Sequence, residues 1–251
     1  MQDLTTSFIG RLRARDSAAW FELWETFGPV LERQLARWGG GRIGRETVQD
    51  LSQETMASLA SAIDRHDPNR GARFSTWLLA IARYTLSDEL DRRTAQKRGG
   101  GKRAESLENL DQAAAGPSPD AEYELAVYDA KVEAALRALE RGLDFVDFET
   151  FRMRVLEGRS GREVAQSLGT SEPTVSRRLA RARDVLRGEL QLIFQRYSFT
   201  EDELLEPARK GLAPSPNKGT DPTADAAFDE AIGDTYARIA QRRVGAARPP
   251  A

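Results

Sequence analysis

The spacing of apolar residues is the feature that most constrains the fold of this chain. Along residues 19–38, apolar side chains such as Leu23 and Phe27 recur at intervals of three and four, and Gly39-Gly40-Gly41 ends this run. This spacing places side chains on one face of a helix. The same spacing recurs in residues 46–63, 74–93 and 123–196. No stretch of useful length alternates apolar and polar residues as a half-buried strand does, so we predict an all-α fold.

Breaks in this periodicity divide the chain into four segments. We predict a first helical domain at 1–95, a flexible linker at 96–122, a second helical domain at 123–196 and a C-terminal extension at 197–251. The linker contains a glycine triplet and two prolines, which do not sustain a helix. The extension has an acidic stretch at 200–206, which could form a short helix, and an amphipathic stripe at 222–243. Either a regulatory or docking helix or a weakly ordered appendage would fit this extension.

Composition excludes several kinds of site. The 251 residues include no cysteine and one histidine, His66, so metal sites built on thiolate or imidazole and histidine-based triads are not expected. The sequence has no phosphate-binding glycine loop and no recognisable nucleophile–base pair. We therefore predict that the chain is not an enzyme and binds no metal or cofactor. It shows neither an apolar run that could span a membrane nor a signal peptide, which predicts a cytoplasmic protein without membrane contact.

Charge is segregated along the chain although its net value is only −2. Six Lys or Arg residues and no acid lie between Arg92 and Arg103. Five Arg residues and one Asp lie between Arg177 and Arg187, and acidic residues gather at 201–206. Local basic patches on a mildly acidic body predict local contacts with nucleic acid.

Residues 161–179 are typical of a helix-turn-helix. Gly169 falls where the turn needs a positive φ angle, and Ala165 is small where two helices cross closely. Thr170-Ser171 is suited to cap the second helix, and Pro173 is suited to its first turn. Turn chemistry, helix contacts and a basic second helix therefore agree.

The second helix of this motif carries the candidate residues for reading duplex DNA. Early side chains on such a helix contact base edges, while later arginines reach phosphates. Arginine bound to guanine is the commonest specific contact, so Arg177 and Arg178 are the first candidates. The alternative is an ordinary pair of packed helices with a solvated basic face. The candidate DNA-binding residues are Glu172, Thr174, Arg177, Arg178 and Arg181.

Two motifs in the first domain resemble region 2 of bacterial sigma factors. One is Asp50-Leu51-Ser52-Gln53-Glu54, and the other begins Asp67-Pro68-Asn69-Arg70-Gly71-Ala72-Arg73-Phe74-Ser75-Thr76-Trp77-Leu78 and continues to Arg83. The helix-turn-helix resembles region 4 of the same family. The resemblance covers about residues 8–195. The chain lacks a region 3, and in this it resembles the extracytoplasmic-function (ECF) group. It implies a region 2 bundle and a region 4 helix-turn-helix joined by a flexible linker.

The resemblance implies a sigma factor that binds core RNA polymerase and directs promoter-specific initiation. Region 2 would bind the largest-subunit coiled coil and melt the −10 element, and region 4 would read the −35 element and bind the flap. The polymerase-binding residues would be Asp50, Leu51, Gln53 and Glu54. The DNA-binding residues of region 2 would be Asn69, Arg70, Arg73, Arg83, Tyr84, Asp88, Arg92 and Arg93. We expect Phe74 and Trp77 in the core, and Ser75 as the cap of their helix.

The chain departs from the family before the polymerase-binding motif. Many members carry Asp-x-Glu-Asp there, whereas this chain has Thr47-Val48-Gln49-Asp50. One hypothesis is that phosphorylation of Thr47, or of nearby Ser52, restores the negative charge. A Ser/Thr kinase would then be a partner, as is thought for some sigma factors resembling this type. The other interpretation is neutral drift. An anti-sigma factor is a further candidate partner.

A free-standing helix-turn-helix regulator that acts without polymerase recruitment is the alternative function. Such regulators usually read paired half-sites as dimers. This alternative accounts for the basic second helix but not for the two motifs of the first domain.

Overall fold

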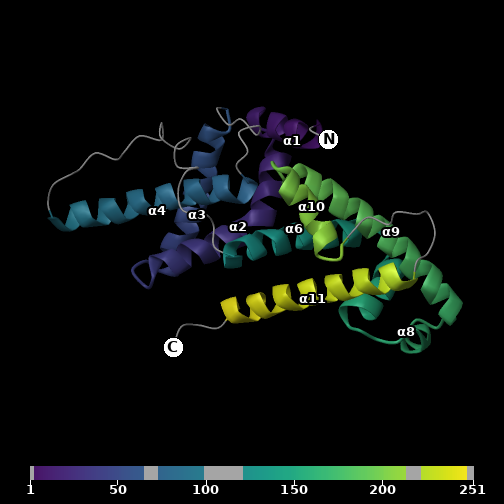
Figure 1. Cartoon of the computed structure of the whole chain (residues 1–251). Helices are drawn as coiled ribbons and strands as arrows, with labels where there is room; N and C mark the ends of the chain where they lie inside the picture. Colours follow the sequence, from purple (N-terminus) through teal and green to yellow (C-terminus); the bar gives the residue numbers. More distant parts are fainter. Residues whose placement is uncertain (1–2, 65–72, 99–120, 213–221, 248–251) are drawn as a thin grey trace. The chain divides into compact units, whose positions relative to one another are not determined.

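The computed structural model describes residues 3–64, 73–98, 121–212 and 222–247 (Figure 1). Every regular element in these ranges is helical, which confirms the all-α prediction. The elements are α1 (Asp3–Arg13), α2 (Ser17–Gly39), α3 (Arg45–Ala62), α4 (Phe74–Arg98), α6 (Ala121–Gly142), α7 (Phe145–Phe151), the π-helical turn η3 (Arg152–Leu156), α8 (Gly161–Ser167), α9 (Glu172–Arg196), α10 (Glu201–Arg209) and α11 (Pro222–Ala247).

The chain divides into two compact units. Unit 1 comprises Met1–Ala130 and Tyr197–Thr200, and unit 2 comprises Lys131–Arg196 and Glu201–Ala251. The division falls inside α6. The predicted linker lies mostly outside the described residues, and its two ends lie in α4 and α6. The predicted domain limits stay a prediction.

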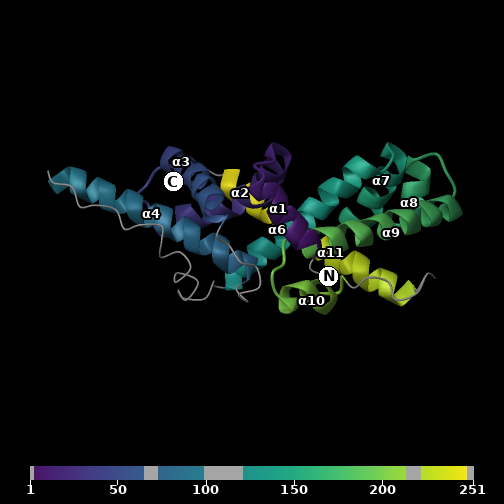
Figure 2. The same ribbon diagram turned by 90° about the horizontal axis from the view of Figure 1, so that it is seen from above.

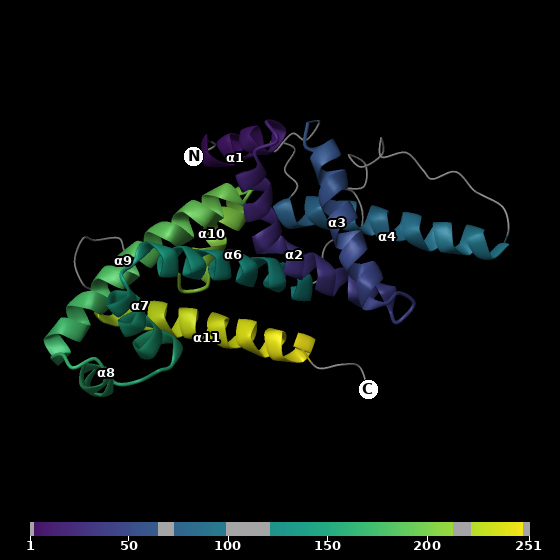
Figure 3. The ribbon, with the colours of Figure 1, turned by 180° about the vertical axis from the view of Figure 1, so that it is seen from behind.

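The core of unit 1 lies among α2, α3 and α4, which pack on one another (Figure 3). The apolar face of α2 is fully buried at Leu23, Phe27 and Leu31. Helix α2 ends where Gly40 adopts the left-handed conformation with φ 52° and donates its N–H to the carbonyl of Ala36. The triplet Gly39-Gly40-Gly41 therefore ends this helix as the sequence predicts, because glycine takes positive φ without a steric penalty.

An aromatic cluster completes the core of unit 1. The ring of Tyr197 lies 5.1 Å from that of Phe8 and 5.0 Å from that of Phe27, measured between centroids. Phe74 and Trp77 each pack against Phe199, with centroids 5.3 and 6.0 Å apart. The prediction that Phe74 and Trp77 belong to the core is confirmed, since they are 1% and 8% exposed.

Unit 2 contains the helix-turn-helix, in which α7 and α8 both pack on α9 (Figure 2). Asp144 caps α7 by accepting hydrogen bonds from the N–H groups of Val146 and Asp147. At α8, the side chains of Ser160 and Glu163 form a reciprocal capping box. These caps satisfy N–H groups that would otherwise lack partners, and so fix where both helices begin.

The C-terminal extension is helical in its described part. Helix α10 packs against α9, and α11 packs against η3. Phe228, Ile232 and Ile239 of α11 are almost fully buried. The predicted amphipathic stripe is therefore a packed helix of unit 2, and the idea of a weakly ordered appendage does not fit residues 222–239.

Candidate functional site

The turn between α8 and α9 has the geometry that its sequence predicts. Gly169 adopts φ 60°, and the N–H of the next residue, Thr170, bonds to the carbonyl of Ala165 at 2.9 Å. Val164, Ala165 and Val175 form a buried cluster beneath the turn. These contacts fix α9 relative to α8, as a DNA-reading helix requires.

The first turns of α9 present polar groups to solvent. Glu172 and Arg177 are exposed, and Thr174 is half-buried. Arg177 donates to the Thr174 hydroxyl at 3.3 Å, and that hydroxyl lies 3.0 Å from the Ser171 hydroxyl. Arg177 is thus exposed, and among the described residues the structure shows it bound only to a neighbouring hydroxyl of its own helix.

Two further arginines of α9 are held by a buried carboxylate. Arg178 Nε lies 3.5 Å from Asp147 Oδ1, and Arg181 Nη1 lies 3.2 Å from Asp147 Oδ2. The Asp147 side chain is only 6% exposed. Burial, together with the nearby charge of Asp144, raises the pKa of Asp147. Asp147 therefore ties both arginines to α7 while their guanidinium groups stay partly exposed.

The remaining arginines of the basic stretch face another direction. Arg183 and Arg187 pair with Asp225 and Asp229 of α11 and are 13% and 10% exposed at their side chains. The basic stretch from Arg177 to Arg187 is therefore divided into a solvent-facing part and a part covered by α11.

The residues predicted to bind polymerase lie on α3. Asp50, Gln53 and Glu54 are exposed, whereas Leu51 is 2% exposed and belongs to the core. Residues three and four apart lie on the same helix face, so the three polar side chains form one surface, and Leu51 supports it from below.

Thr47 lies one turn before this surface and is already paired. Arg93 of α4 donates to the Thr47 hydroxyl at 2.8 Å and to Glu89 at 2.6 Å. Arg92 donates to the same carboxylate. Burial alone would raise the pKa of Glu89, but the hydrogen bonds from Arg93 and Arg92 outweigh it and lower the pKa.

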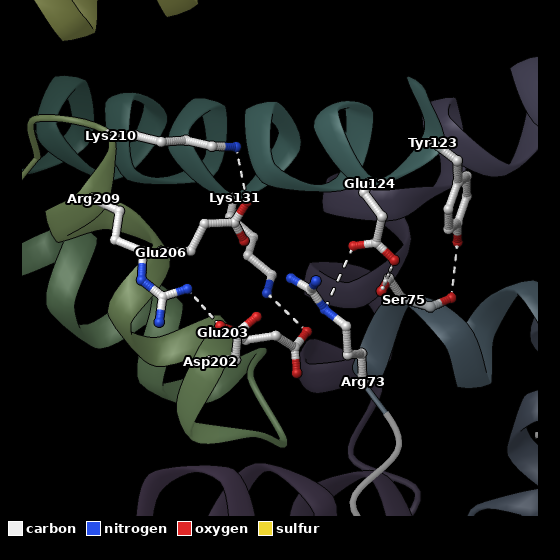
Figure 4. A network of polar contacts seen from close by, with 10 residues as sticks. All are labelled: Arg73, Ser75, Tyr123, Glu124, Lys131, Asp202, Glu203, Glu206, Arg209 and Lys210. Atoms are coloured by element: carbon white, nitrogen blue, oxygen red, sulfur yellow. Dashed lines mark hydrogen bonds and ion pairs between the residues drawn. The ribbon is translucent and has the colours of Figure 1, made fainter. Parts of the chain in front are cut away.

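The start of α4 carries a second polar group (Figure 4). Ser75 donates to the carboxylate of Glu124 at 2.7 Å, and Arg73 Nε lies 3.6 Å from the same carboxylate. The hydroxyl of Tyr123 donates to the Ser75 carbonyl at 3.3 Å. Ser75 is the second residue of α4 and binds a carboxylate, so the expectation that it caps this helix is wrong. The nearby candidates Asn69 and Arg70 lie outside the described residues.

The other region 2 candidates lie within α4. The guanidinium of Arg83 stacks over Trp38 at 4.9 Å from the ring centroid. Arg83 and Arg92 are exposed, while Tyr84, Asp88 and Arg93 are half-buried. Tyr84, Asp88 and Arg92 are spaced four residues apart and therefore lie on one face of α4.

Three acidic residues that position these candidates were not selected from the sequence. Glu89 could have been found, because it lies three and four residues before Arg92 and Arg93. Asp147 and Glu124 gave no such signal, since their partners lie 31 to 51 residues away along the chain. Ion pairs of this kind depend on tertiary packing.

Among the described helices, none is long and apolar enough to cross a bilayer. Within the same ranges, no three potential ligand side chains gather as a metal site would require.

The chain is similar to known transcription factors over most of its length. The family model for the ECF sigma factor matches residues 2–192. The RNA polymerase sigma factor NccH of Alcaligenes xylosoxydans xylosoxydans is 29% identical over 176 residues, which are 70% of this chain and 89% of that protein. The ECF RNA polymerase sigma factor SigC of Mycobacterium tuberculosis is 32% identical over 146 residues, 58% of this chain and 71% of the relative. With both motifs and the helix-turn-helix inside the matched range, the chain belongs to the ECF sigma factor family, whose members bind core RNA polymerase and direct initiation at particular promoters.

Proposed function

We propose that the two units divide promoter recognition between them, with α9 reading the −35 duplex and α4 capturing the −10 strand. The exposed surface of Asp50, Gln53 and Glu54 would bind the largest-subunit coiled coil, and unit 2 would bind the flap. The observation that carries the proposal is α3, where three polar residues share one exposed face above buried Leu51. Carboxylates and amides on such a face suit arginines of a partner. The chain would act in the cytoplasm as a specificity subunit, without catalysis of its own.

Transcription in vitro with core polymerase on a promoter library tests this proposal. We expect specific transcripts only when the chain is added. Gln53→Ala should weaken polymerase binding, and Arg177→Ala should weaken promoter discrimination by about 1–3 kcal/mol if it contacts a base. Arg209→Ala, an exposed arginine of α10, is the matched control. Specific DNA binding without any effect on polymerase would instead favour the free-standing regulator.

Replacing Asp147 by asparagine should separate specificity from affinity. The substitution removes the charge that holds Arg178 and Arg181, so both arginines become free to contact any phosphate. We expect non-specific DNA affinity to be unchanged or higher, and the ratio of specific to non-specific affinity to fall about 10-fold. Because the pKa of Asp147 is raised in the fold, its charged form is disfavoured there, and asparagine should cost little stability at neutral pH.

Competition binding with promoter and random duplexes measures that ratio, and Asp184→Asn on the exposed side of α9 serves as the control. A parallel loss of both affinities would show that Asp147 acts only on folding.

We further propose that a phosphate on Thr47 would bind Arg93. Arg93 already donates to the Thr47 hydroxyl, and Thr47 is the third residue of α3, where negative charge is favoured by the helix dipole. Ser52 is an unsuitable acceptor because it is 0% exposed and donates to the Gln49 carbonyl.

Thr47→Asp should bind core polymerase several-fold more tightly than Thr47→Ala, since the added charge lies one turn from Asp50. Ser61→Asp, which adds the same charge near the other end of α3, should have no such effect. Equal polymerase affinity of the Thr47→Asp and Thr47→Ala variants would contradict a charge switch at this position.

A further inference from the structure

Helix α11 is bound to unit 2 through a set of buried ion pairs. Arg183 Nε donates to Asp229 Oδ1 at 2.8 Å, and Arg183 Nη1 lies 3.2 Å from Asp225 Oδ2. Arg187 Nη2 donates to Asp225 Oδ1 at 2.7 Å. Burial opposes the charge of Arg183, but its hydrogen bond with Asp229 and the charges of both aspartates raise its pKa. Two acids spaced one helical turn apart thus match two arginines spaced one turn apart.

Apolar contacts complete the fit of α11. The guanidinium of Arg187 lies over the Phe228 ring, 4.5 Å from its centroid. Phe228 is 1% exposed and Ile232 is fully buried. A Cβ on Gly233 would lie 3.3 Å from the Val155 carbonyl, so glycine lets α11 approach η3 closely. We define the α11 groove as the surface of Val155, Arg183 and Arg187 that these residues cover.

The α11 groove does not cover Arg177 of α9. Arg183 and Arg187 follow Arg177 by six and ten residues, which places them about 120° and 80° from Arg177 around the helix axis at 3.6 residues per turn. Arg177 remains exposed while α11 is bound. Occupation of the groove therefore leaves Arg177 accessible. The groove is filled by two acids and an aromatic ring of one helix, which indicates that a protein helix is the ligand that fits it.

The groove belongs to the shared family region, but its occupant does not. Val155, Arg183 and Arg187 lie inside the matched residues 2–192, whereas α11 begins at Pro222. The alignment with the relative NccH covers 89% of NccH but only 70% of this chain. A sigma factor that ends near the close of the matched region has few residues beyond it that could cover this surface. The corresponding surface of such a protein is then open to a partner.

We propose that the α11 groove is a docking surface for an acidic amphipathic helix of core RNA polymerase, and that α11 is its competitor within the same chain. The proposal rests on the proposed function, because it takes polymerase as the partner of unit 2. An incoming helix with acids one turn apart would replace the Asp225 and Asp229 pairs with equivalent ones, so the arginines are never left unpaired. A tethered helix competes at a high effective concentration. The apparent association constant for polymerase is then the intrinsic one multiplied by the fraction of chains whose groove is free.

A cross-link between α6 and α11 tests the proposal. The chain has no cysteine, so Glu133→Cys/Arg243→Cys would carry the only two thiols, at an exposed ion pair that joins these helices. A short bis-maleimide linker would then hold α11 in place. We expect the cross-linked chain to bind core polymerase at least about 10-fold more weakly than the same chain before cross-linking. The single variant Arg243→Cys treated with the same reagent is the control.

Releasing α11 should have the opposite effect. Asp225→Lys/Asp229→Lys places like charges against Arg183 and Arg187 and should raise polymerase affinity. Adding Arg183→Asp/Arg187→Asp re-forms the pairs with α11 and removes the charges that an acidic helix would bind, so polymerase affinity should then fall below that of the unchanged chain. Circular dichroism checks that the released variant is folded, and the cross-linked pair decides the question if it is not. Equal polymerase affinity before and after cross-linking would overturn the inference alone. Failure of the uncross-linked chain to bind polymerase would overturn the proposed function and the inference together.

Discussion

Replacing Tyr197 by alanine is expected to lower the free energy of unfolding of unit 1 by about 3–5 kcal/mol, the usual cost of removing a buried aromatic side chain. Tyr197 is 0% exposed and packs edge-on against both Phe8 and Phe27. Alanine would leave a cavity among α1, α2 and α4 that rigid helices cannot close fully. The loss is a large part of the stability of a domain of ordinary size.

Tryptophan fluorescence during urea unfolding measures this effect selectively. All four tryptophans of the chain, Trp20, Trp24, Trp38 and Trp77, lie in unit 1. Tyr236→Ala is the matched control, because Tyr236 of α11 is 36% exposed and its removal should cost well under about 1 kcal/mol in this signal. If Tyr197→Ala shifts the transition no more than Tyr236→Ala does, Tyr197 is not part of the core of unit 1.

Tyr197 also shows what local patterns do not reveal. The sequence predicts the helix before it and the acidic helix after it, and it assigns Tyr197 to the extension. Its ring contacts lie 170 and 189 residues away along the chain, as the positions of Phe27 and Phe8 show. A three-residue stretch of Tyr-Ser-Phe has no periodicity, so only the assembled core selects its partners.

Features set by local chemistry were predicted well. Gly40 and Gly169 adopt positive φ at the helix end and at the turn where glycine was expected. The acidic stretch at 200–206 became α10, which begins at Glu201 with three acids in its first turn, where negative charge is favoured. Such features depend on neighbours within one or two turns, which the sequence shows directly.

Features set by ion pairing between distant helices were not predicted. A run of arginines looks uniform in sequence, yet Arg177 is exposed, Arg178 is tied to Asp147 and Arg183 is covered by α11. Helical rotation separates these positions, and the acids that meet them come from other elements. The basic charge of α9 therefore overestimates how much of it can reach DNA.

Replacing Glu203 by alanine is expected to destabilise unit 2 by about 3–5 kcal/mol, because it leaves the ammonium group of Lys131 buried without its carboxylate. Lys131 Nζ lies 3.5 Å from Glu203 Oε1, and the two side chains are only 2% and 1% exposed (Figure 4). The same ammonium lies 5.3 Å from the centroid of the Phe194 ring. Desolvation makes the loss of an ion-pair partner at this depth far more costly than the same loss at the surface.

The double variant Lys131→Met/Glu203→Leu should recover most of that loss, since apolar side chains of similar volume replace both charges. Circular dichroism during urea unfolding of the two single variants and the double variant gives the coupling energy. Glu206→Ala is the matched control on the same helix: its pair with Lys210 is more exposed and should contribute only about 0.3–0.5 kcal/mol. Glu203 belongs to the extension and Lys131 to the shared family region, so a cost for Glu203→Ala no larger than that for Glu206→Ala would mean that α10 is not part of the fold of unit 2. A cost near the expected value would mean that the family's helix-turn-helix unit here depends on residues beyond 192 for its stability.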